Sequence, residues 1–600
     1  MGYAKHALRP ASDPLLHSGA FRLRWRPGPV RRAEMGKADL SRGKALVMGD
    51  DTRGFLATVR SLGRAGIEVH AAPTDFRSPA LASRYLAAVH DIPPWMGDGA
   101  EWHGTMRALL QEQRFDLVVP CDERNLLPLQ RHRDNLGALA RLAIPHDRAI
   151  EILFDKHATR ELARAQGVNV AYGRLAQPGD CAETLLEEFG APIVVKQRHS
   201  YSLTTLGIRG RVHVLADPAK LDAALANAEP DSLVLERYFE GNGLGVSILA
   251  HEGRLLQAFE HHRVHERSGS SFFRVSAPLD PALVAACAAV AEGVRYTGVA
   301  MFEFKRNAAG DWILLEVNAR PWGSLPLPVA LGVDFPYRWY RLLVDGEETP
   351  PVAYRPGVYG RNLIPDIVNS IAEAQSRGLR PSRIGLFVAH RLLHMRRVLT
   401  GGEVQDVMVR DDLAPAIVEL RRGLGSIVRR AGRQLPGARV RTRRAAEAKV
   451  LAARRSGKPL RIMVVCQGNI CRSPFAEAIL RQRLPGAVLA SAGMMPRPGR
   501  ETPLLGRVAA AGLGIDLCTH RSAWLRRDDA EAASLIVVFD ELNLASVADR
   551  YPDLRTPVLK LGDLTGVGDI ADPVDGDSAA FDDAYAKIAR AGARLARLLA

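Results

Sequence analysis

The feature that most constrains this chain is a cysteine that directly follows an apolar strand and precedes an amphipathic helix. The segment LRIMVVCQGNICRSPFAEAIL covers residues 460–480, and five residues separate Cys466 from Arg472 within it. A short loop that leads into a helix N-terminus presents backbone N–H groups and the positive end of the helix dipole. Such donors favour the thiolate form of a cysteine and also bind a tetrahedral oxyanion. The segment therefore predicts a nucleophilic cysteine in a phosphate-binding loop.

The residues near this cysteine are of the types that phosphoryl transfer needs. A guanidinium such as that of Arg472 can bind two oxygens of a transferring phosphoryl group. Gly468 and Asn469 tolerate the positive φ of a loop whose N–H groups turn inward, and Ser473 can hydrogen-bond a thiolate. The leaving group also needs a proton, and the best candidate donor is Asp572 in the loop GDIADPVDG.

This set of residues resembles the low-molecular-weight protein tyrosine phosphatase family over residues 461–600. The signature of that family is a Cys, five residues, Arg, Ser loop near the start of the domain and an Asp-Pro near its end. The resemblance implies a doubly wound parallel sheet and a phosphocysteine intermediate on Cys466. It also implies the other roles: phosphate clamp for Arg472, general acid for Asp572, loop organisation and thiolate stabilisation for Asn469 and Ser473, and loop support for His520.

Two departures restrict what this resemblance implies. Family members that act on phosphotyrosine usually carry aromatic residues just after the Asp-Pro, where Val574 and Asp575 stand in this chain. Phosphatase chemistry is therefore better supported than phosphotyrosine specificity. Thioredoxin-coupled arsenate reductases share the fold and are the less favoured alternative, because they need a downstream cysteine pair and only Cys518 is present.

A second group of functional side chains is predicted in GVAMFEFKRNAAGDWILLEVNARPWGS, residues 298–324. The segment is typical of two strands joined by a turn. Because residues two apart on a strand share a face, we expect Glu316, Asn318 and Arg320 to point into one site, with Glu303 facing them from the neighbouring strand. Two carboxylates and an amide oxygen are hard ligands suited to Mg²⁺ on nucleotide phosphates, and Arg320 would lie beside the transferred phosphate.

Upstream residues complete a predicted nucleotide site. Lys156 follows Asp155 at a predicted helix start and Lys196 ends the apolar strand PIVVK, so both can meet phosphates. The segment SLVLERYFEG, residues 232–241, could offer a strand edge and Glu236 to an adenine.

This ordered set resembles the ATP-grasp superfamily over residues 45–420, in particular its carbamoyl-phosphate-synthase-like and carboxylate–amine ligase branches. Such enzymes transfer the γ-phosphate of ATP to a carboxylate, and an amine or similar nucleophile then displaces the acyl phosphate. The resemblance implies ATP with Mg²⁺ or Mn²⁺, and small-molecule carboxylate and amine substrates. By position it assigns nucleotide binding to Lys156 and Lys196, adenine contact to Glu236, and metal binding to Glu303, Glu316 and Asn318.

The predicted fold class is α/β, with three folded domains. Alternating apolar strands and amphipathic helices predict a doubly wound domain first, paired strands with glycine-containing turns follow, and a second doubly wound domain closes the chain. The predicted organisation is a disordered basic extension at 1–44, a pre-ATP-grasp α/β domain at 45–150, an ATP-grasp domain with a helical C-terminal part at 151–420, a basic linker at 421–458 and the phosphatase-like domain at 459–600.

The positive charge of the chain is concentrated outside the predicted domains. The formal net charge is +15, but residues 1–44 hold ten Lys and Arg against three acidic residues, and residues 421–458 hold thirteen against Glu447 alone. The folded domains are therefore mildly acidic. Contact of the linker with nucleic acid or a membrane is a less favoured prediction, because few aromatic side chains interleave with its arginines. Residues 1–34 need not belong to the native protein, since Met35 is a second possible start.

The sequence thus predicts a bifunctional enzyme, an ATP-grasp ligase fused to a cysteine-dependent phosphatase. Its phosphatase substrate would be a phosphorylated protein or a small phosphoester. The alternative is a phosphatase regulated by an ATP-binding module that does not catalyse ligation. Six cysteines without a disulfide or zinc spacing pattern, and the absence of a long apolar run, favour the cytoplasm. The oligomeric state is not predicted.

Overall fold

The structure is a computed structural model of the 600-residue chain. It describes residues 43–599 except 204–205, 207–211, 227–230, 268–269, 377–395, 423–437, 456–459, 496–497, 552 and 575. The predicted basic extension at 1–44 lies outside the described residues except for its last two positions. No helix in these described ranges is long and apolar enough to cross a membrane.

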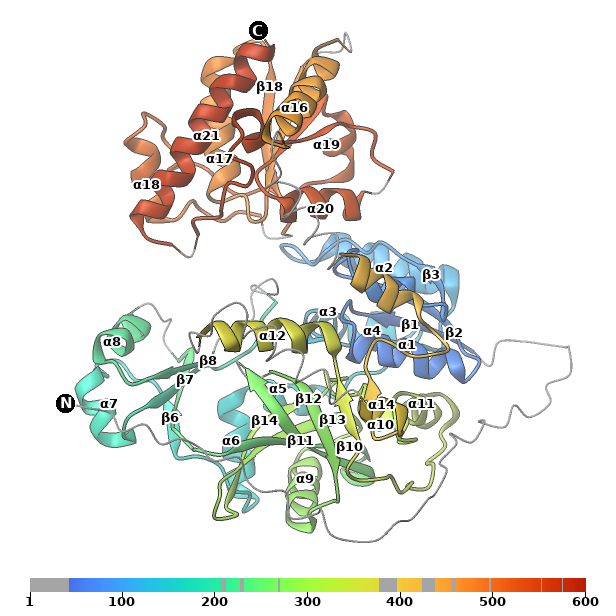
Figure 1. The fold of residues 1–600 in the computed structure, drawn as a ribbon. Coiled ribbons are helices and arrows are strands. Elements are labelled where there is room, and N and C mark those ends of the chain that lie inside the picture. The colour runs from blue at the N-terminus through green and yellow to red at the C-terminus, as the bar shows by residue number, and fades with distance from the viewer. Residues whose placement is uncertain are drawn as a thin grey trace, which may run out of the picture. The chain divides into compact units, whose positions relative to one another are not determined.

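The first domain is built on a five-stranded parallel sheet (Figure 1). Strands β1, β2 and β4 are largely buried. The strand order β3-β2-β1-β4-β5 places the point where the chain reverses direction between β1 and β4. Ligand sites of open α/β sheets lie at the carboxyl ends of the strands at such a point. The elements are β1 (Lys44–Met48), α1 (Gly54–Arg64), β2 (Glu68–Ala72), η1 (Pro79–Ala82), β3 (Leu86–Val89), α2 (Ala100–Gln113), β4 (Leu117–Pro120), α3 (Glu123–Arg131), α4 (Arg133–Gly137) and β5 (Arg141–Leu142).

The second domain contains a small sheet and a large one. The small antiparallel sheet has the order β6-β9-β7-β8. Its apolar core lies under two helices and includes Leu185, Phe189, Val195 and Leu235. The elements are α5 (Asp147–Leu153), α6 (Lys156–Ala165), β6 (Gly173–Leu175), α7 (Ala182–Phe189), β7 (Ile193–Gln197), β8 (Val212–Leu215), α8 (Pro218–Ala226) and β9 (Leu233–Arg237).

The large sheet has seven strands in the order β14-β13-β10-β11-β12-β15-β16. One face packs on α9 through a core that includes Val246, Phe302 and Phe304. The other face shares a core with the first domain, in which Val47 and Phe55 join Phe259. The elements are β10 (Asn242–His251), β11 (Arg254–Arg267), β12 (Ser270–Ala277), α9 (Pro281–Gly293), β13 (Gly298–Arg306), β14 (Trp312–Asn318), α10 (Pro326–Ala330), α11 (Phe335–Tyr340), the π-helix η2 (Arg341–Asp345), β15 (Tyr359–Arg361), α12 (Leu363–Ser376), α14 (Arg396–Leu399) and β16 (Glu403–Gln405).

The C-terminal part of this domain is not wholly helical as predicted. Residues 359–361 and 403–405 form two strands, β15 and β16, that extend the large sheet. Each strand has only three residues, so neither leaves a periodic pattern that sequence could reveal. A buried ion pair between Arg361 on β15 and Glu403 on β16, with 2.8 Å between Nε and Oε1, joins them.

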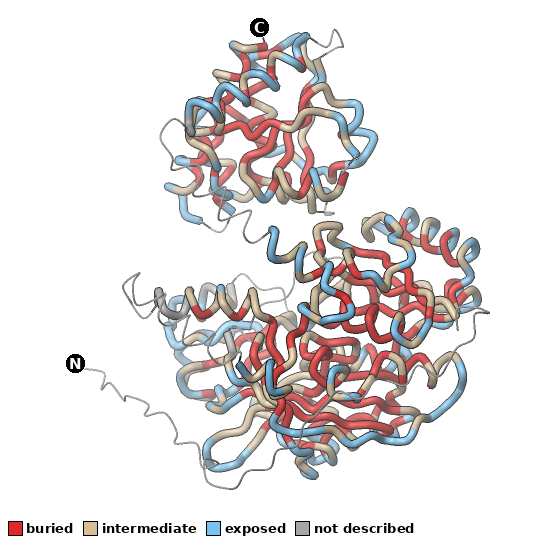
Figure 2. Tube along the Cα trace, turned by 45° about the vertical axis from the view of Figure 1, so that its right-hand side comes forward, coloured by how far each residue is buried: buried red, intermediate tan, exposed pale blue. Residues whose placement is uncertain are grey.

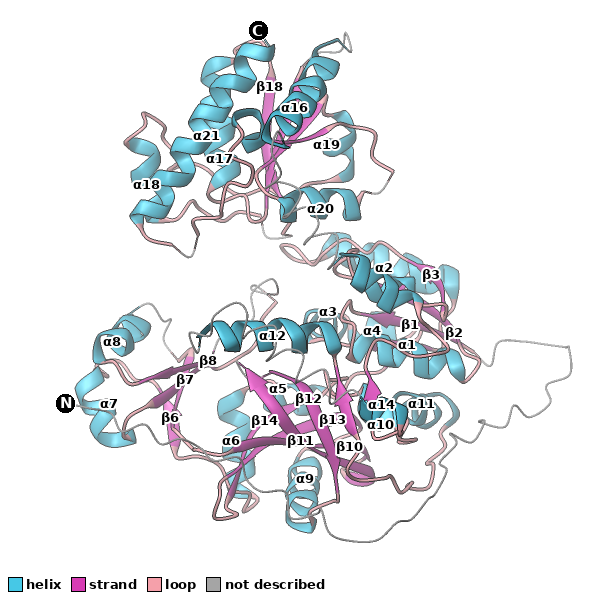
Figure 3. Ribbon diagram, viewed as in Figure 1, coloured by secondary structure: helices cyan, strands magenta, loops and turns pink. Residues whose placement is uncertain are grey.

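The third domain is a four-stranded parallel sheet in the order β18-β17-β19-β20. Figure 2 shows its buried strands and Figure 3 the helices around them. Helices α17 and α21 contribute to the core on one face and α19 and α20 to the core on the other. The α/β fold class with parallel first and last domains is thus confirmed. The elements are β17 (Arg461–Cys466), α17 (Arg472–Arg483), β18 (Val488–Gly493), α18 (Leu504–Ala511), α19 (Arg527–Ala532), β19 (Leu535–Val538), α20 (Glu541–Arg550), β20 (Val558–Lys560), the 3-10 helix η3 (Leu561–Thr565) and α21 (Ser578–Leu599).

The charge pattern of the basic segment at 421–458 favours a solvated helix or a flexible linker, and its second half is a helix with one packed face. Residues Ala438–Arg455 form helix α16. Its small apolar side chains Ala446, Val450 and Ala453 are buried in the core of the third domain. Glu447, the one acidic residue of the segment, pairs with Arg594 at 2.8 Å. Alanine and valine at helical spacing therefore form a packing face. The sequence did not indicate this face because the segment has almost no larger apolar side chains.

Candidate active sites

The thiol of Cys466 lies at the carboxyl end of β17, the strand where the chain of the third domain reverses direction. Its Sγ is 3.0 Å from Ser473 Oγ and accepts a hydrogen bond from the Asn469 backbone N–H at 3.2 Å. Only 2% of Cys466 is exposed. The loop and the start of α17 therefore each place one hydrogen-bonding group at the sulfur, a backbone N–H and a hydroxyl.

The loop conformation depends on Asn469, which is fully buried and has a φ of +51°. Its side-chain amide donates to Ser473 Oγ and Ser491 Oγ, both at 2.9 Å, and its Oδ1 accepts from the Ala523 N–H at 2.6 Å. A histidine supports the same residue, with His520 Nε2 2.7 Å from the Asn469 carbonyl oxygen. The sequence identified Gly468 and Asn469 as residues that tolerate a positive φ, and of these two Asn469 adopts it.

Arg472 is the first residue of α17, and its side chain is 1% exposed. It donates to Asp540 Oδ2 at 2.5 Å, to the Ile570 carbonyl oxygen at 2.9 Å and to Asp572 Oδ2 at 2.5 Å. Burial opposes its positive charge, yet the pKa of Arg472 is raised, because Asp572, Cys466 and Asp540 more than offset the burial. The guanidinium is therefore charged and held directly beside the thiol loop.

The structure brings Asp572 to this arginine across a sequence distance of one hundred residues. Its side chain is 32% exposed, so it stands between the buried guanidinium and solvent. All the residues that were predicted for this site, from Cys466 to Ser473 together with Asp572, thus converge at the carboxyl edge of one sheet.

Two further residues of this site were not assigned from sequence. Asp540 bonds Arg472 and also caps α20 by accepting from the Asn543 N–H. Arg500 donates to the Gly468 carbonyl oxygen at 2.6 Å. The pattern of an aspartate between the buried strand VVF and a helix was a usable signal for Asp540, whereas nothing local marks Arg500.

In the second domain, Glu303, Glu316, Asn318 and Arg320 also come together. Glu303 and Glu316 are direct cross-strand partners on β13 and β14. The amide nitrogen of Asn318 lies 3.1 Å from Glu303 Oε1 and 3.4 Å from Glu316 Oε1, and its Oδ1 accepts from Arg320 at 3.1 Å. Two carboxylates around one amide form a compact set of hard oxygen atoms, which is the donor chemistry that Mg²⁺ prefers.

Two neighbours of this set were not predicted to act on it. Arg263 on β11 forms an ion pair with Glu303, so a cation already faces that carboxylate. Glu123, at the start of α3 in the first domain, bonds Arg320 at 3.2 Å. The pKa of Arg320 is raised, because Glu123 and Asp122 outweigh the effect of its burial. Among the described residues no three His, Cys, Asp or Glu side chains form a metal-binding group, so an oxygen of Asn318 would have to supply the third ligand.

The predicted nucleotide-binding residues lie on the small sheet and at the start of α6. Lys196 on β7 pairs with Glu236 on β9 at 2.7 Å, and both are largely buried. Glu236 also lies 3.4 Å from Arg160. Lys156 donates to Ser200 at 2.8 Å. The structure therefore joins Lys196 to Glu236 directly, a pairing that the separate sequence assignments did not foresee.

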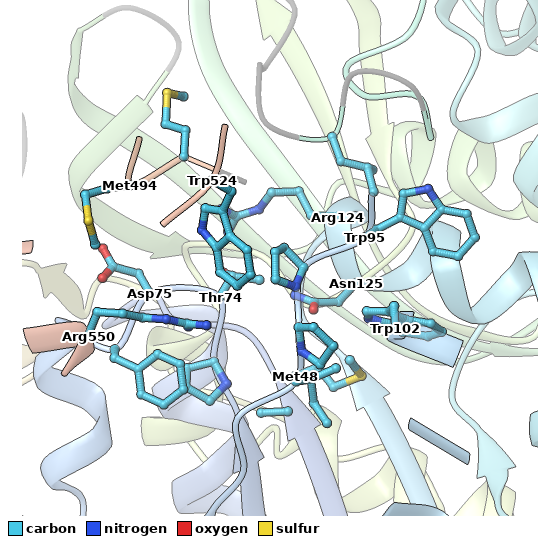
Figure 4. Close-up of a pocket in the computed structure, with 18 of the residues that line it drawn as sticks. Met48, Thr74, Asp75, Trp95, Trp102, Arg124, Asn125, Met494, Trp524 and Arg550 are labelled. Carbon is cyan, nitrogen blue, oxygen red and sulfur yellow. The ribbon is translucent and has the colours of Figure 1, made fainter. Parts of the chain in front are cut away.

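The carboxyl edge of the first sheet carries polar and aromatic side chains (Figure 4). Arg124 is 2.6 Å from Asp122 and 3.4 Å from Asp50, and the Trp95 and Trp102 rings lie 5.8 Å apart. The neighbouring Glu123 pairs with Arg320, so this edge contacts the segment that directly follows β14, the strand of Glu316.

Two family models match separate parts of the chain. Residues 461–600 match the family model described as low molecular weight phosphotyrosine protein phosphatase, and residues 229–362 match the model described as ATP-grasp in the biosynthetic pathway with Ter operon.

The curated relatives are phosphatases that match about a fifth of the chain, whereas solved structures are similar to both parts. The "Probable low molecular weight protein-tyrosine-phosphatase EpsP" of Ralstonia nicotianae is 39% identical over 22% of this chain and 88% of its own length. The low molecular weight protein-tyrosine-phosphatase Etp of Escherichia coli is 33% identical over 23% of this chain and 93% of its own. The biotin carboxylase domain of Hydrogenobacter thermophilus 2-oxoglutarate carboxylase, solved with MgADP and bicarbonate, is 18% identical with a TM-score of 0.44, over 53% of this chain and 73% of its own.

Proposed function

Because the chain belongs, through residues 461–600, to the low molecular weight protein-tyrosine-phosphatase family, we propose that this domain hydrolyses phosphate monoesters through a phosphocysteine. The observation that supports it most is the position of Cys466. Its sulfur accepts from a loop N–H and lies beside Ser473, while Arg472 and Asp572 stand at the same loop.

The proposed reaction has two steps, formation of a phosphocysteine and its hydrolysis, and the same residues act in both. The Cys466 thiolate attacks phosphorus, the bond from phosphorus to the ester oxygen breaks, and Asp572 gives its proton to the departing oxygen. Throughout this step Arg472 binds two phosphoryl oxygens in place of Asp572. Water next attacks phosphorus, the sulfur–phosphorus bond breaks, and the proton of the water returns to the Asp572 carboxylate. Inorganic phosphate and the thiolate are the products.

The experiment that tests this proposal is trapping of the intermediate. The full-length protein should hydrolyse p-nitrophenyl phosphate at mildly acidic pH. Acid quenching during turnover should leave phosphate on the peptide that contains Cys466, detected by mass spectrometry. Turnover without a phosphorylated cysteine peptide under any quench would contradict the proposed mechanism.

The packing of β18 beneath the loop allows a further prediction. A Cβ at Gly493 would lie 3.0 Å from the Gly468 carbonyl carbon, 3.1 Å from the Asn469 nitrogen and 3.1 Å from the Gln467 oxygen. Because these are backbone atoms, Gly493→Ala should shift the loop, lower kcat/KM for p-nitrophenyl phosphate about tenfold, and cost about 1–3 kcal/mol of unfolding free energy. Gly512→Ala is the control, since its Cβ would meet no atom closer than 3.5 Å. Equal activity of the two variants would show that the loop yields without cost.

The substrate of the phosphatase is proposed only by class. Val574 follows the Asp-Pro pair and is 41% exposed, so it offers no aromatic ring to stack on a phenyl group. We therefore propose a phosphorylated protein or small phosphoester as substrate, with phosphotyrosine as one candidate. Comparing kcat/KM for phosphotyrosine peptides with that for alkyl phosphates would decide between them.

For the N-terminal half we propose an ATP-dependent ligase in which a carboxylate accepts the γ-phosphate and an amine displaces it. The observation that supports this is the convergence of Glu303, Glu316 and Asn318 with Arg320. Glu303, Glu316 and the amide oxygen of Asn318 would hold Mg²⁺, or Mn²⁺, which when bound would neutralise charge on the nucleotide phosphates. Lys156 and Lys196 would bind phosphates, and Glu236 would lie at the adenine. Arg320 would stabilise the transferred group.

A second candidate function is an ATP-sensing module that regulates the phosphatase without ligation. The ion pairs that occupy Lys196, Glu236 and Glu303 favour it, because these side chains are partly committed to each other. ADP release that requires both a carboxylate and an amine would establish the ligase. A phosphatase rate that changes with ATP, with no ADP release across a broad panel of acids and amines, would establish the sensor.

A further inference from the structure

A buried lysine pairs with sequence neighbours of the residues that bond Arg472, and it takes no part in the reaction proposed above. Lys560 ends β20, and only 2% of its side chain is exposed. Its Nζ lies 2.8 Å from Glu541 Oε1, 2.8 Å from Asp569 Oδ1 and 3.4 Å from Asp563 Oδ1. One ammonium group therefore joins three carboxylates from three separate segments.

Two of these carboxylates lie directly beside the groups that hold Arg472. Glu541 follows Asp540, which accepts from Arg472 at 2.5 Å. Asp569 precedes Ile570, whose carbonyl oxygen accepts from Arg472 at 2.9 Å. The segment from Asp569 then continues to the general acid candidate, Asp572. Lys560 thus connects the strand end that carries one acceptor of Arg472 with the loop that carries the other two.

Burying the ammonium group of Lys560 costs free energy, and its acidic partners do not need it for their own solvation. Removing an ammonium group from water costs several kcal/mol unless its partners compensate. Glu541 and Asp569 are 33% and 43% exposed, so each could be hydrated without the lysine. Burial acts against the charge of Lys560, but its pKa is raised by the hydrogen bonds that it donates to Asp569 and Glu541. The lysine therefore stays charged and keeps its partners in place.

We infer that Lys560 is a positioning residue for the phosphatase reaction, which fixes the Asp569–Asp572 loop against Asp540 so that Asp572 reaches the departing oxygen. This inference rests on the proposed phosphatase function. Without substrate, Asp572 accepts a hydrogen bond from Arg472. When Arg472 turns to the phosphoryl group, Asp572 loses that bond and has to contact the leaving oxygen of the substrate instead. A loop tied to Lys560 keeps the carboxyl group near the leaving group during this exchange, whereas an untied loop would let it move into solvent.

The test is the dependence of the rate on the leaving group. Phenyl phosphate has a much more basic leaving oxygen than p-nitrophenyl phosphate, so its cleavage depends more strongly on a well-placed general acid. For the full-length protein we expect Lys560→Met to lower the ratio of kcat/KM for phenyl phosphate to that for p-nitrophenyl phosphate about tenfold. The matched control is Lys587→Met, because Lys587 pairs with a single carboxylate, Asp583, within helix α21, and there the ratio should be unchanged.

A purely structural role would give a different result. If Lys560→Met lowered both rates by the same factor, or neither, the inference would be overturned. Two milder variants decide the question if Lys560→Met does not fold: Glu541→Gln and Asp569→Asn each remove one carboxylate from a partly exposed position and should lower the ratio in the same direction. A wild-type protein inactive on both phosphates would instead contradict the proposed phosphatase function itself.

Discussion

Replacement of Cys466 by serine is expected to reduce hydrolysis of p-nitrophenyl phosphate by at least about a thousandfold. The serine hydroxyl does not ionise near neutral pH, and the donors around this position, the Asn469 N–H and Ser473, can stabilise only an anion that has formed. Because serine is nearly isosteric and Cys466 is buried, the loop should keep its shape. The measurement is steady-state release of p-nitrophenol by the full-length protein.

The control for this prediction is Cys518→Ser in the same domain. Cys518 is exposed and lies outside the loop, so its replacement should leave the rate unchanged. Binding of inorganic phosphate or vanadate should survive in Cys466→Ser, since Arg472 and the loop N–H groups remain. Turnover of Cys466→Ser at the wild-type rate would place the nucleophile elsewhere and remove the basis of the phosphocysteine proposal.

The phosphate loop could be predicted from sequence because its chemistry is contiguous. The residues from Cys466 to Ser473 follow one another in a strand–loop–helix unit, and the local pattern fixes their proximity. Asp572 is distant in sequence, but its Asp-Pro signature identified it, and the structure places it on Arg472. Gly468 and Asn469 were both identified as tolerating a positive φ, and Asn469 is the one that has it, since sequence alone shows which residues tolerate that conformation but not which one adopts it.

The residues that sequence could not reveal are those whose partners meet only through topology. Asp540 follows β19, Arg500 lies in the segment after β18, and Lys560 ends β20. The side chains of Asp540 and Arg500 reach the site from these segments, and that of Lys560 reaches the neighbours of Asp540 and Ile570. A parallel sheet brings such strand ends to one edge, so their neighbourhood could be expected but not their pairings. The same limit applies to Arg263 and Glu123, which engage Glu303 and Arg320 from other strands and another domain.

Helix α16 shows that composition and charge alone do not decide whether a segment packs on a domain. The charge of residues 421–458 indicated a solvated segment, and most of its arginines are indeed exposed where the structure describes them. The helix nevertheless buries Val450 completely. A narrow stripe of alanine and valine is enough to pack a helix on an existing core, even when the remaining faces carry strong positive charge.

In the N-terminal half, the substitution with the largest expected effect is Glu316→Gln. It keeps the shape of the side chain but removes the negative charge and one of the two carboxylate oxygens that, with Glu303 and Asn318, would hold Mg²⁺. We expect Mg²⁺-dependent ADP release to fall at least about a hundredfold, while hydrolysis of p-nitrophenyl phosphate stays unchanged. Where no acceptor has yet been found, the increase in Tm produced by ATP in Mg²⁺ over that in EDTA is the alternative measurement, and it should shrink in the variant.

The control for Glu316 is Glu187→Gln on the exposed surface of α7 in the same domain, which should retain the full Mg²⁺-dependent increase. If ATP stabilised the wild type and Glu316→Gln equally in Mg²⁺ and in EDTA, the two glutamates would not be metal ligands, and the pairing of Glu303 with Arg263 would then be their resting role. Loss of the Mg²⁺ dependence in Glu316→Gln together with an intact phosphatase, and the reverse pattern in Cys466→Ser, would show that two independent phosphoryl-transfer sites operate on one chain.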